Sequence, residues 1–436
     1  MPIHSLNPKR SQVPFSPENR ASQVGWALAL MLLALSPVST KIGGALWLIL
    51  VVGGLLVWWR TRDETRADDH EGACRVAWVW LGFCVAGALL KLVGVLYWGD
   101  PVGTRHFEIR LTLAAGATWL LLRQLPSGFI DFGRLRLALL VAAAFALGVS
   151  IAHAYFNVET PSNRINWAGG LVMLAFAQIA LLGQSVRARD VAVTILTLFL
   201  LLLSVLLTGA RGAYLAIPWL ALSALGALLL VGQRPVVQRL RLTMRFVVPL
   251  LVLTAVTVLL VPKVVNVPAQ RLQLALEEVQ ATIVAGDTRN YVNSPVFVRI
   301  RFWQRSWEAI QQSPWLGHGR DRRIEMIQEW ADEAGSDEMR RHIHVHNEYL
   351  NGWLDHGIIG LVSTLCFMVG LFVAAALAGR INVHVGIGVL GVGVLHVLMS
   401  LTDTNTGTNN YGVMMSLSMA VMLLSLERRR TLGTAS

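Results

Sequence analysis

The stretch DVAVTILTLFLLLLSVLLT, residues 190–208, is almost entirely aliphatic and carries no charge after Asp190. A helix of this length and composition is long enough to cross the hydrocarbon core of a bilayer, which is roughly 30 Å thick. The whole chain has the same character, since 54% of its 436 residues are hydrophobic and only 14% are charged. This composition is typical of a protein that crosses a membrane many times.

Outward from this stretch, about twelve apolar runs are long enough to span a bilayer. They lie near residues 24–38, 42–59, 75–98, 109–125, 135–156, 165–184, 190–208, 212–232, 245–262, 357–379, 381–402 and 410–426. We therefore predict an all-α polytopic membrane protein. Its three cysteines indicate neither a disulfide framework nor a metal cluster.

The arginines predict how the bundle is oriented. If every run crosses once, one side of the membrane carries most of the arginines, whereas the opposite short loops carry only Lys41, Arg105, Arg110, Arg164 and Arg211. The positive-inside rule makes the arginine-rich side cytoplasmic and places both termini there. The net charge of +11 thus reflects membrane topology, and nucleic acid is not expected as a partner.

This topology divides the chain into three parts. Residues 1–262 would form an N-terminal bundle of about nine spans, and residues 357–436 a C-terminal bundle of about three. Residues 263–356 would form one large loop outside the cytoplasm, too long for a simple connector. The loop is expected to be helical, with a helix start at Ser294-Pro295 and an apolar stripe through Val296, Ile300, Trp303, Trp307 and Ile310.

Two arginines at the outer side are candidates for binding an anion. Arg211 lies in Thr208-Gly209-Ala210-Arg211-Gly212 between two apolar runs, and Arg299 lies one helical turn before Trp303. Ordinary snorkelling along apolar surface is the alternative for both. Two guanidinium groups together suit a diphosphate, because each can bind phosphate oxygens in a bidentate manner. Arg305 is expected to point to solvent.

His346 is the candidate general base in the segment His342-Ile343-His344-Val345-His346-Asn347-Glu348-Tyr349-Leu350. An unperturbed histidine, with a pKa near 6.5, can accept a proton at neutral pH. Asn347 and Glu348 fit the first turn of a helix. The alternation of His342, His344 and His346 also allows a zinc site, but no partner stands at a recognised ligand spacing, so we predict no metal.

These motifs resemble the O-antigen ligase and polymerase superfamily. The similar features are Gly209-Ala210-Arg211-Gly212, then Ser294 through Arg299 and Trp303, then Pro314-Trp315-Leu316-Gly317-His318-Gly319, then His346 through Leu350; Asp403 resembles a less specific family acid. The similarity covers roughly residues 160–410. It implies a metal-independent glycosyltransferase of GT-C type, without a cofactor, in the inner membrane of a bacterium and with its loop and active site in the periplasm.

The resemblance also implies the substrates. The donor would be a glycan on undecaprenyl diphosphate. A ligase would transfer it to a sugar of the lipid A core, a polymerase to a second lipid-linked glycan, and a related group to a protein hydroxyl; the total length and single long loop favour the ligase. His346, Arg211 and Arg299 would carry the chemistry, and Arg164, Asn347, Tyr349 and the intramembrane Lys91 would bind substrate. A lipid or glycan transporter, gated by the outer segment, is the alternative of a different class.

Overall fold

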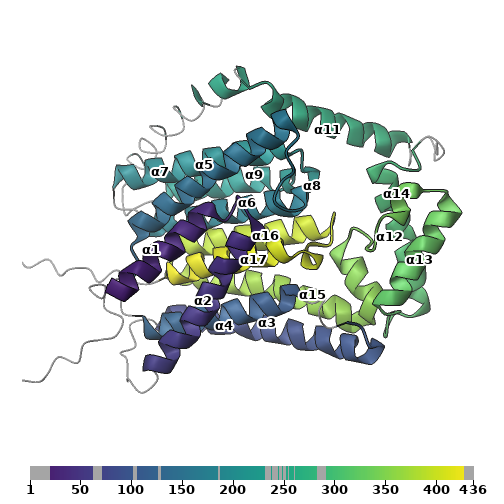
Figure 1. Cartoon of the computed structure of the whole chain (residues 1–436), viewed down its shortest axis with the longest axis horizontal. Coiled ribbons are helices and arrows are strands. Elements are labelled where there is room, and N and C mark those ends of the chain that lie inside the picture. The colour runs from purple at the N-terminus through teal and green to yellow at the C-terminus, as the bar shows by residue number, and fades with distance from the viewer. Residues whose placement is uncertain are drawn as a thin grey trace, which may run out of the picture.

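A computed structural model of the chain describes residues 20–61, 71–101, 106–125, 129–184, 187–230, 261–281 and 291–426, with isolated positions between 237 and 259. Every regular element in these ranges is a helix (Figure 1). The fold is therefore all-α there, as the composition predicts. The predicted span at 245–262 is described only in part, and several of the arginine-rich loops lie outside the described residues.

The helices follow the predicted apolar runs closely. In the first half of the chain they are α1 Arg20–Leu35, α2 Thr40–Thr61, α3 Glu71–Trp98, α4 His106–Gln124, α5 Phe132–Phe156, α6 Arg164–Ala180, α7 Ala188–Thr208, α8 Arg211–Tyr214 and α9 Ile217–Leu229. In the second half they are α11 Lys263–Val279, α12 Pro295–Gln312, α13 Arg320–Ala334, α14 Asp337–Arg340, α15 Glu348–Ile381, α16 Val383–Ser400 and α17 Asn409–Leu424.

Eight helical stretches in the described part of the chain are long and apolar enough to cross a membrane. They do not include α1 and α17, which have 16 residues each, or α4. The chain is thus a multi-pass membrane protein, and the larger number of twelve spans remains a prediction.

Two predicted spans have a break in the helix at or near their first residues. The run at 212–232 consists of the single turn α8 followed by α9, and Gly209 takes the left-handed conformation before them, with φ of 69°. The run at 357–379 is the second half of α15, which begins at Glu348 and bends at His356 and Gly357. Both interruptions border the helices that carry the candidate site residues.

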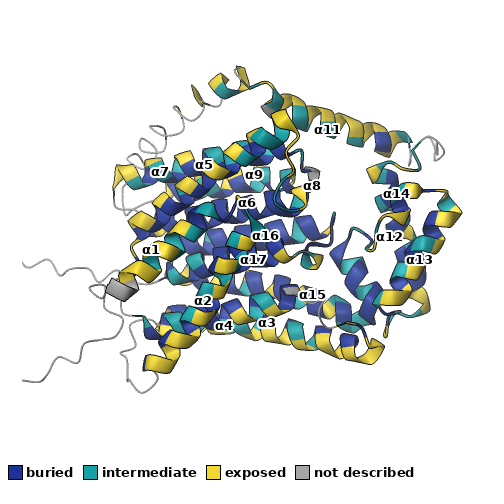
Figure 2. Ribbon diagram, in the orientation of Figure 1, coloured by how far each residue is buried: buried dark blue, intermediate teal, exposed yellow. Residues whose placement is uncertain are grey.

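The core of the bundle surrounds α6. Of the apolar window Arg164–Gln184, 94% is buried, which makes it the most enclosed of the candidate spans, and α7, α16 and α17 pack against α6. By contrast, α2 and α3 keep apolar residues such as Leu55 and Leu89 on their outward faces (Figure 2). An outer face of this kind is what a lipid-facing helix needs, because lipid tails are as apolar as leucine.

A second, smaller core lies where α12, α13 and α14 gather around the first turns of α15 (Figure 1). The predicted helical loop at 263–356 is confirmed as helical, including the cap, since the Ser294 hydroxyl accepts from Phe297 N and Pro295 begins α12. The predicted apolar stripe of α12 is only partly correct, since Ile310 is buried and Trp303 packs against the second core, but other residues make up much of the buried face. Val298, Phe302 and Ala309 are buried, whereas Trp307 is 49% exposed.

Candidate functional site

The loop between α16 and α17, residues 401–408, brings the separate sequence motifs together. Asp403 is 2% exposed, and its Oδ1 accepts a hydrogen bond from Thr404 N at 2.9 Å, which fixes the turn. Burial tends to raise the pKa of this carboxyl, but the hydrogen bond from His346 and the neighbouring histidines bring it below its usual value. Asp403 is therefore held as a buried carboxylate.

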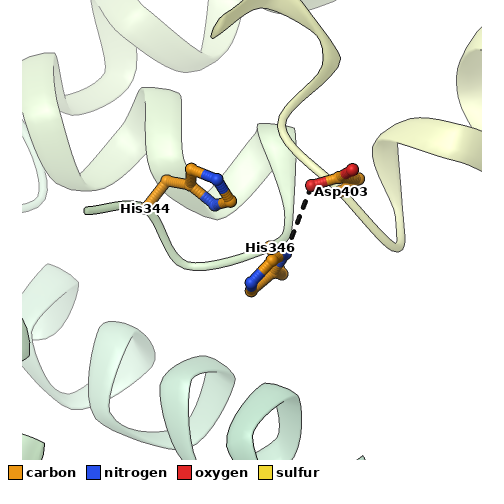
Figure 3. Close-up of side chains that lie close together, drawn as sticks. All are labelled: His344, His346 and Asp403. Atoms are coloured by element: carbon orange, nitrogen blue, oxygen red, sulfur yellow. Dashed lines mark hydrogen bonds and ion pairs between the residues drawn. The ribbon is translucent and has the colours of Figure 1, made fainter. Parts of the chain in front are cut away.

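His346 faces this carboxylate from the segment that precedes α15. Its Nδ1 lies 3.2 Å from Asp403 Oδ1, as the dashed line in Figure 3 marks. Its ring stacks on Phe302 of α12, with centroids 6.4 Å apart. His346 has φ of 52°, a left-handed conformation that costs a non-glycine residue on the order of 1–3 kcal/mol. Strain at a residue that is hydrogen-bonded to a buried acid points to a functional role for His346.

The two neighbouring histidines lie equally close to His346 but contact it differently. The ring centroids of His342 and His344 are each 4.4 Å from that of His346. Only His342 shares a hydrogen bond with it, between His346 Nε2 and His342 Nδ1 at 3.2 Å. Burial, followed by the proximity of His346, lowers the pKa of His342 to about 4 and that of His344 to about 3. Both are neutral at pH 7.

Arg299 reaches the same loop from α12. Its Nε donates to the carbonyl oxygen of Thr402 at 3.2 Å, next to Asp403, and its Nη1 donates to Pro295 O at 3.3 Å. The neighbouring Arg305 points elsewhere, but not to open solvent as predicted. It is 27% exposed and forms ion pairs with Glu308 and with Glu333 of α13. Of Arg299 and Arg305, Arg299 is therefore the one that lies at the site.

The turn that contains Arg211 also borders the loop. A Cβ built on Gly212 would lie 2.9 Å from Thr402 Oγ1, so only glycine allows α8 to approach so closely. The backbone of Arg211 thus begins α8 next to the site, while its side chain is not described. Arg164, at the start of α6, interacts electrostatically with Arg271 of α11, which lies against Gly209. The sequence analysis did not single out Arg271.

Asn347 and Tyr349 are both tied to the protein backbone. Asn347 Oδ1 caps α15 by accepting from Leu350 N, and its Nδ2 donates to Leu401 O at 3.4 Å. The Tyr349 hydroxyl donates to Val397 O at 3.3 Å. In the structure these two predicted substrate-binding residues therefore fasten α15 to α16 and to the loop.

Lys91, the remaining predicted substrate-binding residue, lies deeper. It is 6% exposed and lines a small cavity together with Glu108, Glu348, Thr406 and His396. This cavity lies on the side of the loop where Thr406 is found, and His346 is not among its lining residues.

The motif Pro314–Gly319 supports the bend in α15. His318 N and Gly319 N donate to the carbonyl oxygens of Leu354 and Asp355, each at 2.8 Å, and Ile358 N donates to Pro314 O at 3.0 Å. The bend thereby finds partners for backbone groups that a continuous helix would satisfy internally. The motif therefore stabilises the helix that follows His346, and its own residues do not contact His346 or Asp403 through any hydrogen bond among the described residues.

His344, His346 and Asp403 also offer donor atoms of the kind that bind metals. One atom from each lies within 4.8 Å of the others, and His344 Nδ1 and Asp403 Oδ2 have no hydrogen-bond partner in the part of the chain that is described (Figure 3). The sequence analysis found no acidic partner for the histidines, because Asp403 is far from them in the chain. We interpret the arrangement as a histidine–aspartate pair, since the hydrogen bond between His346 and Asp403 is already formed.

Residues 196–365 match the family model described as O-antigen ligase. The matched region includes Arg211, Arg299 and the three histidines, and it ends before Asp403. No curated protein matches the chain significantly.

Proposed function

Because residues 196–365 form an O-antigen ligase family domain, we propose that the protein transfers a glycan from undecaprenyl diphosphate to a sugar of the lipid A core. Glycan transfer of the ligase or polymerase type follows from the family, and the choice of acceptor is our proposal. The observation that carries it is the convergence at loop 401–408 of the His346–Asp403 pair with Arg299.

His346 acts as the general base in this proposal. Asp403 accepts a hydrogen bond from Nδ1–H of His346, which keeps the proton on Nδ1 and leaves Nε2 as the nitrogen that can accept a proton. His342 Nδ1 occupies the hydrogen-bonding position at Nε2. The acceptor hydroxyl therefore binds by replacing His342 at this nitrogen. Neutral His342 can leave without abandoning an ion pair, since its pKa is lowered to about 4.

The transfer is a single displacement at the anomeric carbon of the donor. The acceptor O–H bond breaks as its proton moves to His346 Nε2, the oxygen forms the new glycosidic bond, and the bond to the diphosphate oxygen breaks. This route inverts the anomeric carbon. General base catalysis typically contributes about 10²–10⁴-fold to the rate.

The leaving diphosphate gains negative charge, which Arg299 and Arg211 stabilise. Arg299 reaches Thr402, next to the residue that holds the base, so a phosphate bound there lies beside the reacting centre. Arg164 and Arg271 add positive charge near α8. The mechanism assigns no step to a metal, and the activity should persist in EDTA.

The test uses purified protein with a lipid-linked glycan and three acceptors in parallel: rough lipopolysaccharide, a second lipid-linked glycan and an acceptor protein. Glycan joined to rough lipopolysaccharide supports the ligase. Joining only to the second glycan or to protein would replace it with the polymerase or the protein-glycosylating enzyme. Movement of donor across proteoliposomes without any new glycosidic bond would favour a transporter.

A further inference from the structure

Glu348 is a buried carboxylate that the proposed mechanism does not use. It is 3% exposed and begins α15, two residues after His346. Its Oε2 accepts from Thr406 N at 3.1 Å, and its Oε1 accepts from the Thr406 hydroxyl. Both side-chain oxygens of Glu348 therefore accept hydrogen bonds from one residue, Thr406, of the loop that contains Asp403.

The three residues 346–348 fasten this loop at three successive points. His346 bonds to Asp403, Asn347 donates to Leu401 O, and Glu348 accepts from Thr406. Leu401 and Thr406 lie on either side of Asp403 in the chain. The Asp403 carboxylate is therefore held between two anchors. The anchor made by Glu348 uses both of its side-chain oxygens, whereas Asn347 contributes one hydrogen bond of 3.4 Å to Leu401 O.

Lys91 helps Glu348 to remain in place. Lys91, Glu108 and Glu348 line the same cavity, so the Lys91 side chain lies close to two buried acidic side chains. A buried charge is costly unless it is paired and hydrogen-bonded. Ionisable groups of this kind within membrane helices are rare and usually functional.

We propose that Glu348 is a positioning residue, which holds loop 401–408 through Thr406 so that Asp403 stays aligned with His346. Lys91 supports this contact as a basic side chain in the same cavity as Glu348. The inference rests on the proposed function, because it concerns the alignment of the proposed base. A displacement of about 1 Å at such a pair can reduce a rate by about 100-fold.

The test compares Glu348→Ala and Glu348→Gln in the ligation assay. Glu348→Ala removes the acceptor for Thr406 and should lower kcat by about 10- to 100-fold, with KM for the lipid-linked donor unchanged within about twofold. Glu348→Gln keeps a carbonyl acceptor and should lower kcat by only about threefold. Hydrogen–deuterium exchange in the peptide that contains residues 401–408 should rise in the alanine variant and stay near the wild-type level in the glutamine variant.

Glu108→Ala is the matched control, because Glu108 is a buried carboxylate of the same cavity without a side-chain hydrogen bond to the loop among the described residues. It should leave kcat within about threefold. Thr406→Ala should cause a smaller loss than Glu348→Ala and add little to it in the double variant, since both break one contact. If Glu348→Ala does not fold, Thr406→Ala carries the test alone, with an expected loss in kcat of about three- to tenfold.

Wild-type kcat in Glu348→Ala, or equal losses in Glu348→Ala and Glu108→Ala, would contradict the inference. Failure of the proposed function has a different signature. There His346→Ala itself would retain activity, whereas failure of this inference alone leaves His346→Ala inactive.

Discussion

At the scale of single residues, the site depends on contacts between residues that are far apart in the chain. His346 and Asp403 are separated by 57 positions, and Arg299 and Thr402 by 103. The sequence predicts His346 as a general base and Arg299 as an anion-binding group, because the residue type and the neighbouring residues indicate these roles. It does not predict that Asp403 pairs with His346 or that Glu348 holds Thr406, because tertiary packing alone brings these residues together.

The neutral histidines predict an acid-sensitive fold. The pKa of His342 is lowered to about 4 and that of His344 to about 3, against about 6.5 in the unfolded chain. Between these values the unfolded state binds more protons, so the free energy of unfolding should fall as the pH drops from about 6.5 towards 4. Thermal unfolding in detergent between pH 7.5 and 5 measures this. His344→Gln should weaken the dependence, and an unchanged slope in that variant would contradict the assignment.

Substitutions of Arg299 and Arg305 in α12 should have different effects on kcat. Arg299→Ala should lower kcat by about 100-fold or more, because it removes a charge partner of the leaving diphosphate. Arg305→Ala should leave kcat nearly unchanged and cost only about 0.2–1 kcal/mol of stability, since its ion pairs are partly exposed. Arg299→Lys should keep only part of the activity. Lysine retains the positive charge, but its ammonium group lacks the bidentate fork of the guanidinium. Equal losses at positions 299 and 305 would refute the assignment.

At the scale of elements, the sequence predicts features that depend on neighbouring residues, such as helix starts. It does not fully predict features that depend on tertiary contacts, such as which face of a helix is buried. Ser294-Pro295 predicts the start of α12, because the cap involves only neighbouring residues. The buried face of α12 is predicted only in part. Phe302 packs against His342 and His346 and shares its core with α15, and these contacts do not follow from the sequence of α12 alone. The bend in α15 has one local signal, Gly357, but the hydrogen bonds that fix it come from the loop after α12.

The bend itself gives a prediction about stability. Gly357 has φ of 61° and ψ of −152°, a region open almost only to glycine, and a Cβ there would lie 2.1 Å from Trp315 O. Gly357→Ala should therefore lower the unfolding temperature, with a cost of at least about 1–3 kcal/mol. Gly379→Ala is the control in the same helix, where the nearest atom to the new Cβ is 3.8 Å away. Similar unfolding temperatures for the two variants would show that the bend is not needed.

At the scale of the whole molecule, the proposal requires the site to face the periplasm. The arginine distribution predicts that residues 263–356 lie outside and both termini inside. Ser336, within this loop, is buried and caps α14, so the exposed Asp321 of α13 is the better probe. In a chain without its native cysteines, Asp321→Cys should react with an impermeant thiol reagent in intact spheroplasts. Reaction only after lysis would reverse the orientation.

The central claim is that His346, aligned by Asp403, removes the proton from the acceptor hydroxyl. The most direct test is a parallel measurement, on purified His346→Ala, of ligation and of lipid-linked donor binding. Loss of the base should lower turnover by about 10²–10⁴-fold while the dissociation constant for the donor stays within about twofold, because the arginines that bind the diphosphate remain. Near-normal turnover in His346→Ala would contradict the account.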